Sequence, residues 1–491
     1  MSDYYAGQAD TPRTFYWFDF ETFGADARRD RPAQFAGIRT DENLNILESD
    51  VFYCQLADDY LPNPEACMIT GITPMTCMDT GMPEAEFAAK IYEKFSVPGT
   101  VGVGYNNFGF DDELMRFMFW RNLIDPYARE WGQKRARFDI YNLVRIVYAF
   151  KPQTLKWPLR EDGSFSMRLE HLTAENGLSH EHAHDALSDV KATIALAKLI
   201  KERQPRLWEY TLKLTDKKFG REMLECGQPL LYMNPFAGQK MRYLSLIYPL
   251  QENPNRKNEW YCWDLTHDPK EIESISSKDL ARMYLTREQR DSGIEPLPII
   301  SVRLTNQPFL VKAAGYMGPG AEKGFGIKKD EMFARAGWIQ NTDLSKINSL
   351  WAEKADQLSE KMQEDASEIE TSLYSGGFAS DRDRATMERL RRMTAEDLAG
   401  VAGGIEFDNE RFGDMLLHYR ARNFPETIDD VADEEKWRAY REDHLVGGKN
   451  RSMTFERYFA MLEKLQEERP DREEVIEELF EYGENLASEF Q

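Results

Sequence analysis

The sequence lacks the features that would place it in an oxidising compartment or in a membrane. No apolar run is long enough to span a bilayer. The first residues, "MSDYYAGQADTPR", have neither the basic nor the apolar region of a signal peptide. The cysteines form no CxxC pair, so we expect neither a zinc site nor a disulfide framework; they are Cys54, Cys67, Cys77, Cys226 and Cys262. We therefore expect a protein of the reduced cytoplasm, with no membrane partner.

The chain also lacks the positive charge that is usual in proteins that bind nucleic acids. Its 491 residues carry a formal net charge of −23, which opposes a nucleic-acid partner at first sight. The distribution weakens that objection, because residues 353–491 hold 36 acidic and 19 basic residues and so most of the excess. Residues 192–221 hold eight basic and three acidic residues. Basic patches therefore exist outside the acidic C-terminal part.

The pattern of apolar residues predicts three domains and an α/β fold. Residues 1–203 alternate expected strands (15–23, 34–41, 50–56 and 99–105) with expected helices (137–150 and 186–204), which is typical of an α/β domain with a mixed sheet. Residues 204–352 contain short apolar segments between Pro, Asn and Gly clusters and predict a β-rich domain. Residues 353–491 are expected to be mostly helical, including 350–374, 454–470 and 471–490.

Two carboxylates interrupt the aromatic run "TFYWFDFETFG", residues 14–24. Asp19 and Glu21 are two positions apart, so on a strand they point to the same face. Like charges held close raise each other's pKa unless a cation neutralises them, and Mg²⁺ or Mn²⁺ prefers such oxygen ligands. The alternative, a strand end facing solvent, stays open from this stretch alone.

Two further stretches carry polar residues at expected helix starts. In "NNFGFDDE", residues 106–113, Asp111 and Asp112 open a helix, where the helix dipole alone would favour acidic residues. In "HDALSD", residues 184–189, His184 and Asp189 begin a long helix, and helix-start polarity is again an alternative interpretation. We expect His171 to be structural, and His180 and His182 to lie in a solvated loop.

Taken together and in this order, the three stretches resemble the motifs of the histidine-containing branch of the Asp-Glu-Asp-Asp 3′→5′ exonucleases. Several other stretches are similar to the bacterial exodeoxyribonuclease I family: "DRPAQFAGIRT", "YLPNPEACMITGITP", "RLEHL", "RQPRL", "LYSGGF" and "YRARNFP". The resemblance implies a ribonuclease H-like exonuclease domain (1–203), an SH3-like β domain (204–352) and a C-terminal helical domain (353–491).

The resemblance also implies a two-metal mechanism. Asp19, Glu21, Asp111 and Asp189 would hold two Mg²⁺ ions, with Mn²⁺ possible, and His184 would be the general base. Asp112 and Asp185 do not match the motif positions, and we interpret them as structural.

A single strand is held by cations and stacking aromatic rings, and the resemblance favours one set of contacts. They are Glu21, Arg116, Tyr127, Trp131, Arg145 and Arg168. A surface ion pair is the alternative for each arginine in this acid-rich chain. Tyr374 and Phe378 are further candidates that core packing would explain equally well.

The function implied is processive 3′→5′ hydrolysis of single-stranded DNA to 5′-mononucleotides by a monomeric enzyme of DNA repair and recombination. Two alternatives stay open: the same chemistry on RNA 3′ ends, and a non-catalytic scaffold that binds single strands. The resemblance further implies docking of the acidic C-terminal tail of the single-stranded DNA-binding protein. A tail of that kind needs a basic rim beside an apolar pocket, and the candidate patches are residues 381–392 and 213–221.

Overall fold

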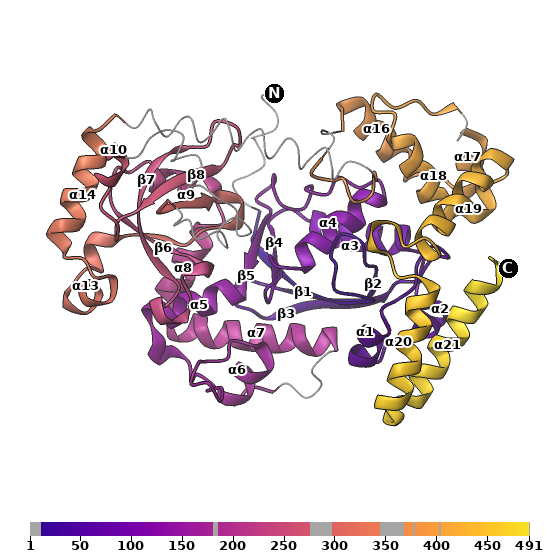
Figure 1. Ribbon diagram of the computed structural model, residues 1–491, viewed down its shortest axis with the longest axis horizontal. Coiled ribbons are helices and arrows are strands. Elements are labelled where there is room, and N and C mark those ends of the chain that lie inside the picture. The colour runs from indigo at the N-terminus through magenta and orange to yellow at the C-terminus, as the bar shows by residue number, and fades with distance from the viewer. Residues whose placement is uncertain are drawn as a thin grey trace. The chain divides into compact units, whose positions relative to one another are not determined.

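The computed structural model describes residues 11–179, 185–274, 297–343, 368–375, 377, 379–401 and 404–490. The chain forms two compact units. The first comprises residues 1–140, 177–198 and 365–491, and the second comprises residues 141–176 and 199–364. The nuclease-like segment and the C-terminal helices are therefore parts of one unit (Figure 1).

The first unit is built on a mixed five-stranded sheet with the order β3-β2-β1-β4-β5. The strands β1, β2 and β3 pair antiparallel, whereas β4 pairs parallel with both β1 and β5. The strand bounds are β1 Thr14–Thr22, β2 Pro32–Thr40, β3 Ile46–Tyr53, β4 Thr100–Gly104 and β5 Ala136–Asp139. This arrangement confirms the mixed sheet that the sequence predicts.

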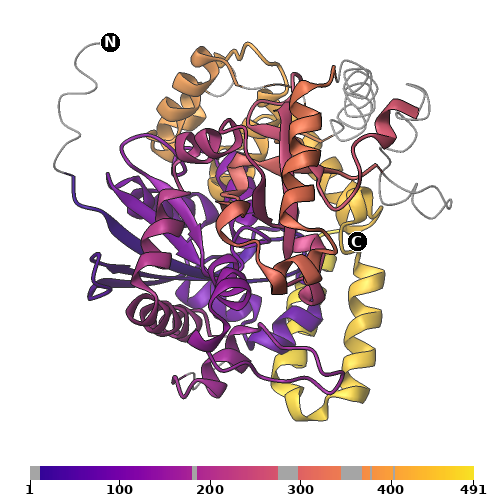
Figure 2. The same cartoon turned by 90° about the vertical axis from the view of Figure 1, so that its left-hand side faces the viewer.

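Helices cover the sheet and extend the first unit at its C-terminal end. Those of the nuclease-like segment are α1 Pro64–Thr70, α2 Pro74–Thr80, α3 Glu84–Ser96, α4 Asp111–Arg121 and the first part of α7 Ala186–Arg203. Those of the C-terminal segment are α16 Asp381–Leu390, α17 Ala395–Val401, α18 Phe412–Asn423, α19 Val431–Leu445, α20 Phe455–Glu468 and α21 Glu473–Ser488. Helices α20 and α21 lie side by side, in yellow in Figures 1 and 2.

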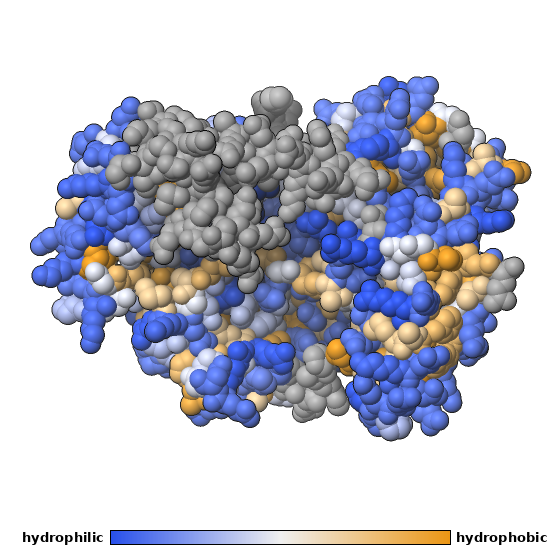
Figure 3. Space-filling view, in the orientation of Figure 1, coloured by the Kyte–Doolittle hydropathy of each residue, from blue (hydrophilic) through white to orange (hydrophobic). Residues whose placement is uncertain are grey.

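Two apolar clusters join the C-terminal helices to the nuclease-like segment. In one, Phe117, Trp120 and Leu123 pack with Met387 and Phe412. In the other, residues of α1 and α2 pack with α20 and α21. Hydrophilic residues cover most of the described surface on the face shown in Figure 3. Burial of these apolar side chains, with hydrophilic residues left at the surface, explains why the acidic helices pack onto the nuclease-like segment.

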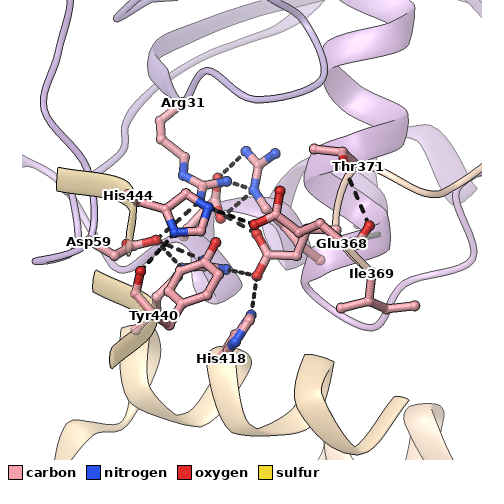
Figure 4. Close-up of polar contacts among 12 residues, drawn as sticks. Arg31, Asp59, Glu368, Ile369, Thr371, His418, Tyr440 and His444 are labelled. Carbon is pink, nitrogen blue, oxygen red and sulfur yellow. Dashed lines mark hydrogen bonds and ion pairs between the residues drawn. The ribbon is translucent and has the colours of Figure 1, made fainter. Parts of the chain in front are cut away.

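A buried polar network crosses the same junction (Figure 4). Arg422 of α18 donates to Asp59 at 2.8 Å and to Glu370 at 2.6 Å. Arg31 lies 3.4 Å from the same Asp59 carboxylate, and His418 contacts Glu370 at 2.8 Å. Two guanidinium groups and two carboxylates thus balance one another away from solvent, as buried charges must.

The second unit contains a second five-stranded sheet with the order β10-β6-β7-β8-β9, in which all pairs are antiparallel. Its strands are β6 Leu230–Met233, β7 Leu244–Glu252, β8 Glu259–Asp264, β9 Ile299–Arg303 and β10 Leu310–Lys312. Its helices are α5 Ile140–Phe150, α6 Leu169–Glu175, α8 Pro205–Lys213, α9 Lys217–Leu224, α10 Glu271–Ser274, α13 Pro319–Phe325 and α14 Lys329–Asn341, with the last part of α7. This sheet is the β-rich domain that the sequence predicts.

Two expectations about secondary structure need correction. Residues 137–150 were expected to be one helix, but the chain forms β5 up to Asp139 before α5 begins at Ile140. Of the helix expected over 350–374, residues 350–367 lie outside the described part, and residues 368–374 form turns that place Glu370 in the buried network. Among the described residues, no helix has the length and apolarity to cross a membrane.

Candidate metal centre

The carboxylates of Asp19, Glu21 and Asp189 meet at one place in the first unit. Their nearest oxygen atoms all lie within 4.8 Å of one another. Asp19 and Glu21 reach it from β1, where Asp19 pairs with Ala36 and Glu21 with Gln34 of β2. The alternation of a strand therefore does place both on one face, as the sequence predicts.

Gln34 also explains why α7 brings Asp189 to this strand. The side-chain oxygen of Gln34 accepts a hydrogen bond from the backbone N–H of Ala186, the first residue of α7, at 3.4 Å. Asp185 stands before that helix, and its carboxylate accepts the N–H of Ser188 at 3.0 Å, which is the geometry of an N-cap. The structural role that the sequence gives Asp185 is consistent with this capping contact.

Asp111, at the N-terminus of α4, lies near enough for its charge to raise the pKa of Asp19 and Glu21, although it is not one of the three residues whose oxygens lie within 4.8 Å. The loop before it contains Asn106 with a φ of 63°, a left-handed conformation that asparagine tolerates better than most residues. The backbone N–H of Asn106 donates to the carboxylate of Asp139 at 2.9 Å. Asp139 thereby ties the loop to the end of β5, and the sequence interpretation missed this residue because it assigned residues 137–150 to a single helix.

The electrostatics of the site show a cluster of unneutralised carboxylates. Burial, and then the charges of Asp111, Glu21 and Asp189, raise the pKa of Asp19 well above its usual value. Burial and the charge of Asp189 raise the pKa of Glu21 to about 8, and burial with the charge of Asp112 raises that of Asp111 to about 7. Four acids arranged in this way favour binding of a cation.

Asp112 faces away from this cluster and into a different environment. Its buried carboxylate accepts a hydrogen bond from Arg137 at 2.7 Å and another from Arg129. Arg129 also lies over the rings of Phe18 and Phe95, at 5.6 and 5.1 Å from their centres. The structural role that the sequence gives Asp112 thus has a definite form, an internal ion pair behind the metal centre.

The residues predicted to contact a strand fall into both units. Arg116 lies on α4. Its guanidinium group pairs with Glu130, at 2.7 Å, and with Glu113, and it lies over the ring of Tyr127, 5.4 Å from the ring centre.

Two predicted aromatic contacts also lie in the first unit. Trp131 is 61% exposed in the loop after α4. Tyr374 hydrogen-bonds Arg116 and packs edge-on against Phe117.

Two of the remaining predicted residues, Arg145 and Arg168, lie in the second unit, and others lie outside the described part of the chain. Arg145 lies over the rings of Tyr141 and Tyr243, at 4.1 and 5.3 Å, and Arg168 pairs with Glu170 at 3.4 Å; all belong to the second unit. The expectations for His184, Phe378, His180 and His182 lie outside the described residues. His171 contacts Ser166 at 2.7 Å, in keeping with a structural role.

Comparison with known proteins places these features in one family. Family models match along the chain as "Exonuclease" (residues 16–197), "Exonuclease I SH3-like domain" (215–359) and "Exonuclease I C-terminal domain" (367–486). The exodeoxyribonuclease I of Haemophilus influenzae is 38% identical over 482 residues, which cover 96% of this chain and 98% of that protein.

Solved structures agree with these matches. E. coli exonuclease I in complex with a dA16 oligonucleotide aligns with a TM-score of 0.84 at 35% identity, covering 96% of this chain and 100% of the other. An ExoI/SSB-Ct complex also aligns with a TM-score of 0.84, at 34% identity over 97% of this chain and 100% of the other. The chain therefore belongs to the exodeoxyribonuclease I family.

Proposed function

We propose that this chain hydrolyses single-stranded DNA from the 3′ end to 5′-mononucleotides, processively, as a monomeric cytoplasmic enzyme of DNA repair and recombination. The observation that carries the proposal is the gathering of Asp19, Glu21 and Asp189, whose oxygen atoms lie within 4.8 Å. The membership of the chain in the exodeoxyribonuclease I family supports the choice of substrate and the 3′→5′ direction.

The donor set fits divalent cations. All of its ligands are carboxylate oxygens, the type that Mg²⁺ and Mn²⁺ prefer, and the raised pKa values of Asp19 and Glu21 reflect charges that a cation would neutralise. We assign two Mg²⁺ ions to Asp19, Glu21, Asp111 and Asp189. When bound, such ions supply an activated water and stabilise the leaving oxygen.

The chain's own residues then supply the proton transfer and the positioning. His184 takes the proton of the attacking water, because an imidazole titrates near neutral pH. Glu21, on the strand next to Asp19, also contacts the terminal nucleotide. Tyr127 and Trp131 offer rings for stacking, and Arg145 and Arg168 pair with phosphates. Arg116, whose guanidinium group lies between two carboxylates and over the ring of Tyr127, also contacts the strand.

End-blocked strands test this proposal. A labelled strand with a blocked 3′ end should resist digestion in Mg²⁺, whereas one blocked at the 5′ end should be degraded to 5′-mononucleotides. Digestion from the 5′ end would contradict the assigned direction. The same assay addresses the alternatives: faster digestion of an RNA strand would favour the RNA enzyme, and binding without digestion would favour the scaffold.

We also propose that the acidic tail of a single-stranded DNA-binding protein docks on the second unit. There, Lys240 and Arg242 line a cavity of about 510 Å³ together with Leu244, Tyr316 and Phe325. This surface combines cations with apolar residues, as an acidic and hydrophobic tail requires. Among the predicted patches, residues 213–221 belong to the same unit. Both patches contain paired arginines: Arg221 pairs with Glu252, and Arg384 pairs with Asp381.

Fluorescence anisotropy of a labelled tail peptide checks this docking surface. Binding should weaken as salt rises, because the charges are screened, and it should weaken in the double variant Lys240→Ala/Arg242→Ala or, within the predicted patch, in Lys217→Ala/Lys218→Ala. A greater loss in Arg391→Ala/Arg392→Ala would move the surface to the other patch. Absence of binding at low salt would remove this partner.

A further inference from the structure

A cavity of about 800 Å³ lies in the first unit, between the nuclease-like helices and the C-terminal segment. Residues of α3, the end of α4, the loop after α4, and α16 with the turn that follows it line the cavity. Its apolar surface includes Tyr92, Leu123, Tyr127, Trp131 and Met387. It is separate from the carboxylates of the metal centre, none of which lines it.

Several of the charged groups that line this cavity have partners of opposite charge. Lys90 lies 3.0 Å from Glu86, and Arg392 pairs with Glu388. Arg384 pairs with Asp381 at 2.5 Å. The acids Glu93 and Asp125 also line the cavity. The acidic and basic residues of the lining therefore nearly balance. A lining of this kind suits a ligand that is mainly aromatic or apolar and carries a single anionic group.

Arg391 differs from its neighbours. Its guanidinium group lies over the ring of Tyr92, 5.6 Å from the ring centre. Its Nε atom is buried and has no hydrogen-bond partner. Within the described part of the chain, no carboxylate pairs with it. A guanidinium group that is oriented by an aromatic ring, but carries no anion, is suited to a phosphate.

The aromatic residues of the cavity supply the second half of a nucleotide site. Trp131 is 61% exposed although it is large and apolar, and Tyr127 lines the cavity beside it. An exposed ring and half-buried rings that line one cavity with an arginine form a combination that holds single strands, because bases stack on the rings and the phosphate pairs with the cation. This favours a nucleic-acid strand over a peptide with several carboxylates.

The position of the cavity relative to the metal centre sets the length of strand needed to reach it. The helix α4 carries Asp111 at its start and Trp120, a lining residue, near its end. That stretch spans about 14 Å, at roughly 1.5 Å per residue. With about 3.4 Å per stacked nucleotide, a strand whose 3′ end lies at the carboxylates reaches the cavity only with about four or more nucleotides.

We propose that this cavity is a distal nucleotide subsite, in which Arg391 binds a backbone phosphate and Tyr92, Tyr127 and Trp131 contact a base of the same single strand. The inference rests on the proposed function. It adds Arg391, which follows the last residue of α16, to the residues that contact the single strand. The subsite holds the strand during successive cleavages and does not take part in the chemistry.

Three variants and two substrates test the subsite. Arg391→Ala removes the cation, and Arg391→Gln removes the charge while keeping much of the side-chain volume. Arg382→Ala is the matched control, because Arg382 does not line the cavity and is exposed and paired with Asp408. The substrates are a trinucleotide and a strand of about 30 nucleotides, with thermal melting to confirm folding. Strand affinity is measured without divalent cations, so that it does not depend on hydrolysis.

For both Arg391 variants, we expect roughly a five- to fifty-fold loss of affinity for the long strand. The slope of log affinity against log salt should fall by about 0.7, the value for one single-strand phosphate contact. Cleavages per binding event should also fall in the Arg391 variants, while their hydrolysis of the trinucleotide stays as in the wild type. Arg382→Ala should match the wild type on both substrates.

Three results would overturn the subsite. In the first, the Arg391 variants bind the long strand as well as Arg382→Ala does. In the second, the Arg391 variants lose as much activity on the trinucleotide as on the long strand. In the third, they bind the tail peptide more weakly but bind the strand as the wild type does. If the wild type binds the strand but does not digest it, the proposed function fails while the subsite is still judged from affinity.

Discussion

Asp111 and Asp112 are consecutive residues at the start of α4, yet their carboxylates lie in opposite electrostatic environments. Burial and the neighbouring acids raise the pKa of Asp111 to about 7. Burial would do the same to Asp112, but Arg129 and Arg137 lower its pKa to about 2. One acid is thus available to a cation from solution, and the other already has its cations inside the protein.

Replacement of Asp112 should therefore damage stability. Asp112→Asn leaves the buried guanidinium group of Arg129 without the carboxylate that it contacts and leaves Arg137 with Glu130, at 3.2 Å. Breaking a buried pair in this way typically costs about 3–5 kcal/mol. Urea unfolding measures the loss. Asp381→Asn is the control, because that carboxylate is exposed and paired only with Arg384, so less than about 1 kcal/mol is expected. A small effect at Asp112 would show that the internal pair is dispensable.

Replacement of Asp19 should separate binding from hydrolysis. Asp19→Ala removes the carboxylate at the centre of the cluster, so hydrolysis of labelled single-stranded DNA should be abolished while strand affinity, followed by anisotropy, stays largely intact. Activity above a few per cent of wild type would contradict the assignment of Asp19 to the metal centre.

His184→Ala should lose most of the activity and keep the metal. Loss of a general base typically costs about 10²–10⁴-fold in rate, whereas metal affinity, measured by calorimetry, should be unchanged. A collapse of metal affinity would make His184 a ligand instead of the base.

Trp131→Ala should affect the substrate much more than the fold. The side chain is 61% exposed, so its removal should change the free energy of unfolding by less than about 0.5 kcal/mol. Loss of a stacked base should cost about 1–3 kcal/mol of strand affinity. Phe236→Ala is the control for an exposed ring, at 95% exposure, and equal effects of the two variants on strand affinity would argue against stacking on Trp131.

The pair of His444 and Glu368 should make stability depend on pH. Burial alone lowers the pKa of His444, but the hydrogen bond to Glu368, at 2.6 Å, and that to the Tyr440 carbonyl raise it above the usual value. The charged imidazole therefore stabilises the fold below its unfolded pKa of about 6.5, and this contribution is lost as pH rises through the folded value.

Unfolding of His444→Gln across that range checks the effect. The variant should lose stability relative to wild type at low pH, and the difference should shrink as pH rises. His267→Gln, at an exposed position, should show no such trend. A difference that is constant with pH would mean that packing, not charge, explains the contribution of His444.

The sequence predicted the parts of the site that depend on local pattern. The aromatic run of β1 and its alternation were enough to place Asp19 and Glu21 on one face, whereas Asp111 and Asp189 were singled out only by the resemblance to the exonuclease motifs. The short strand β5 was missed because Phe138 continues the apolar period of α5, so tertiary pairing with β4 overrode the local signal.

Contacts between distant segments could not be read from local pattern. Arg116 is predicted to bind the strand, and Glu130, which pairs with it, becomes its neighbour only when the loop after α4 folds back. The unpaired state of Arg391 is equally invisible in the sequence, because neighbouring arginines of the same segment have partners. Pairing of charges is a property of the three-dimensional fold.

The contact of Arg422 with Asp59 joins residues 363 positions apart, and this has a consequence for synthesis. The nuclease-like segment leaves the ribosome long before the helix that neutralises its buried carboxylate. Until α18 emerges, Asp59 lacks the contact with Arg422. We therefore expect the first unit to complete its folding only when translation is nearly finished, and a truncated nascent chain to be a target for proteases.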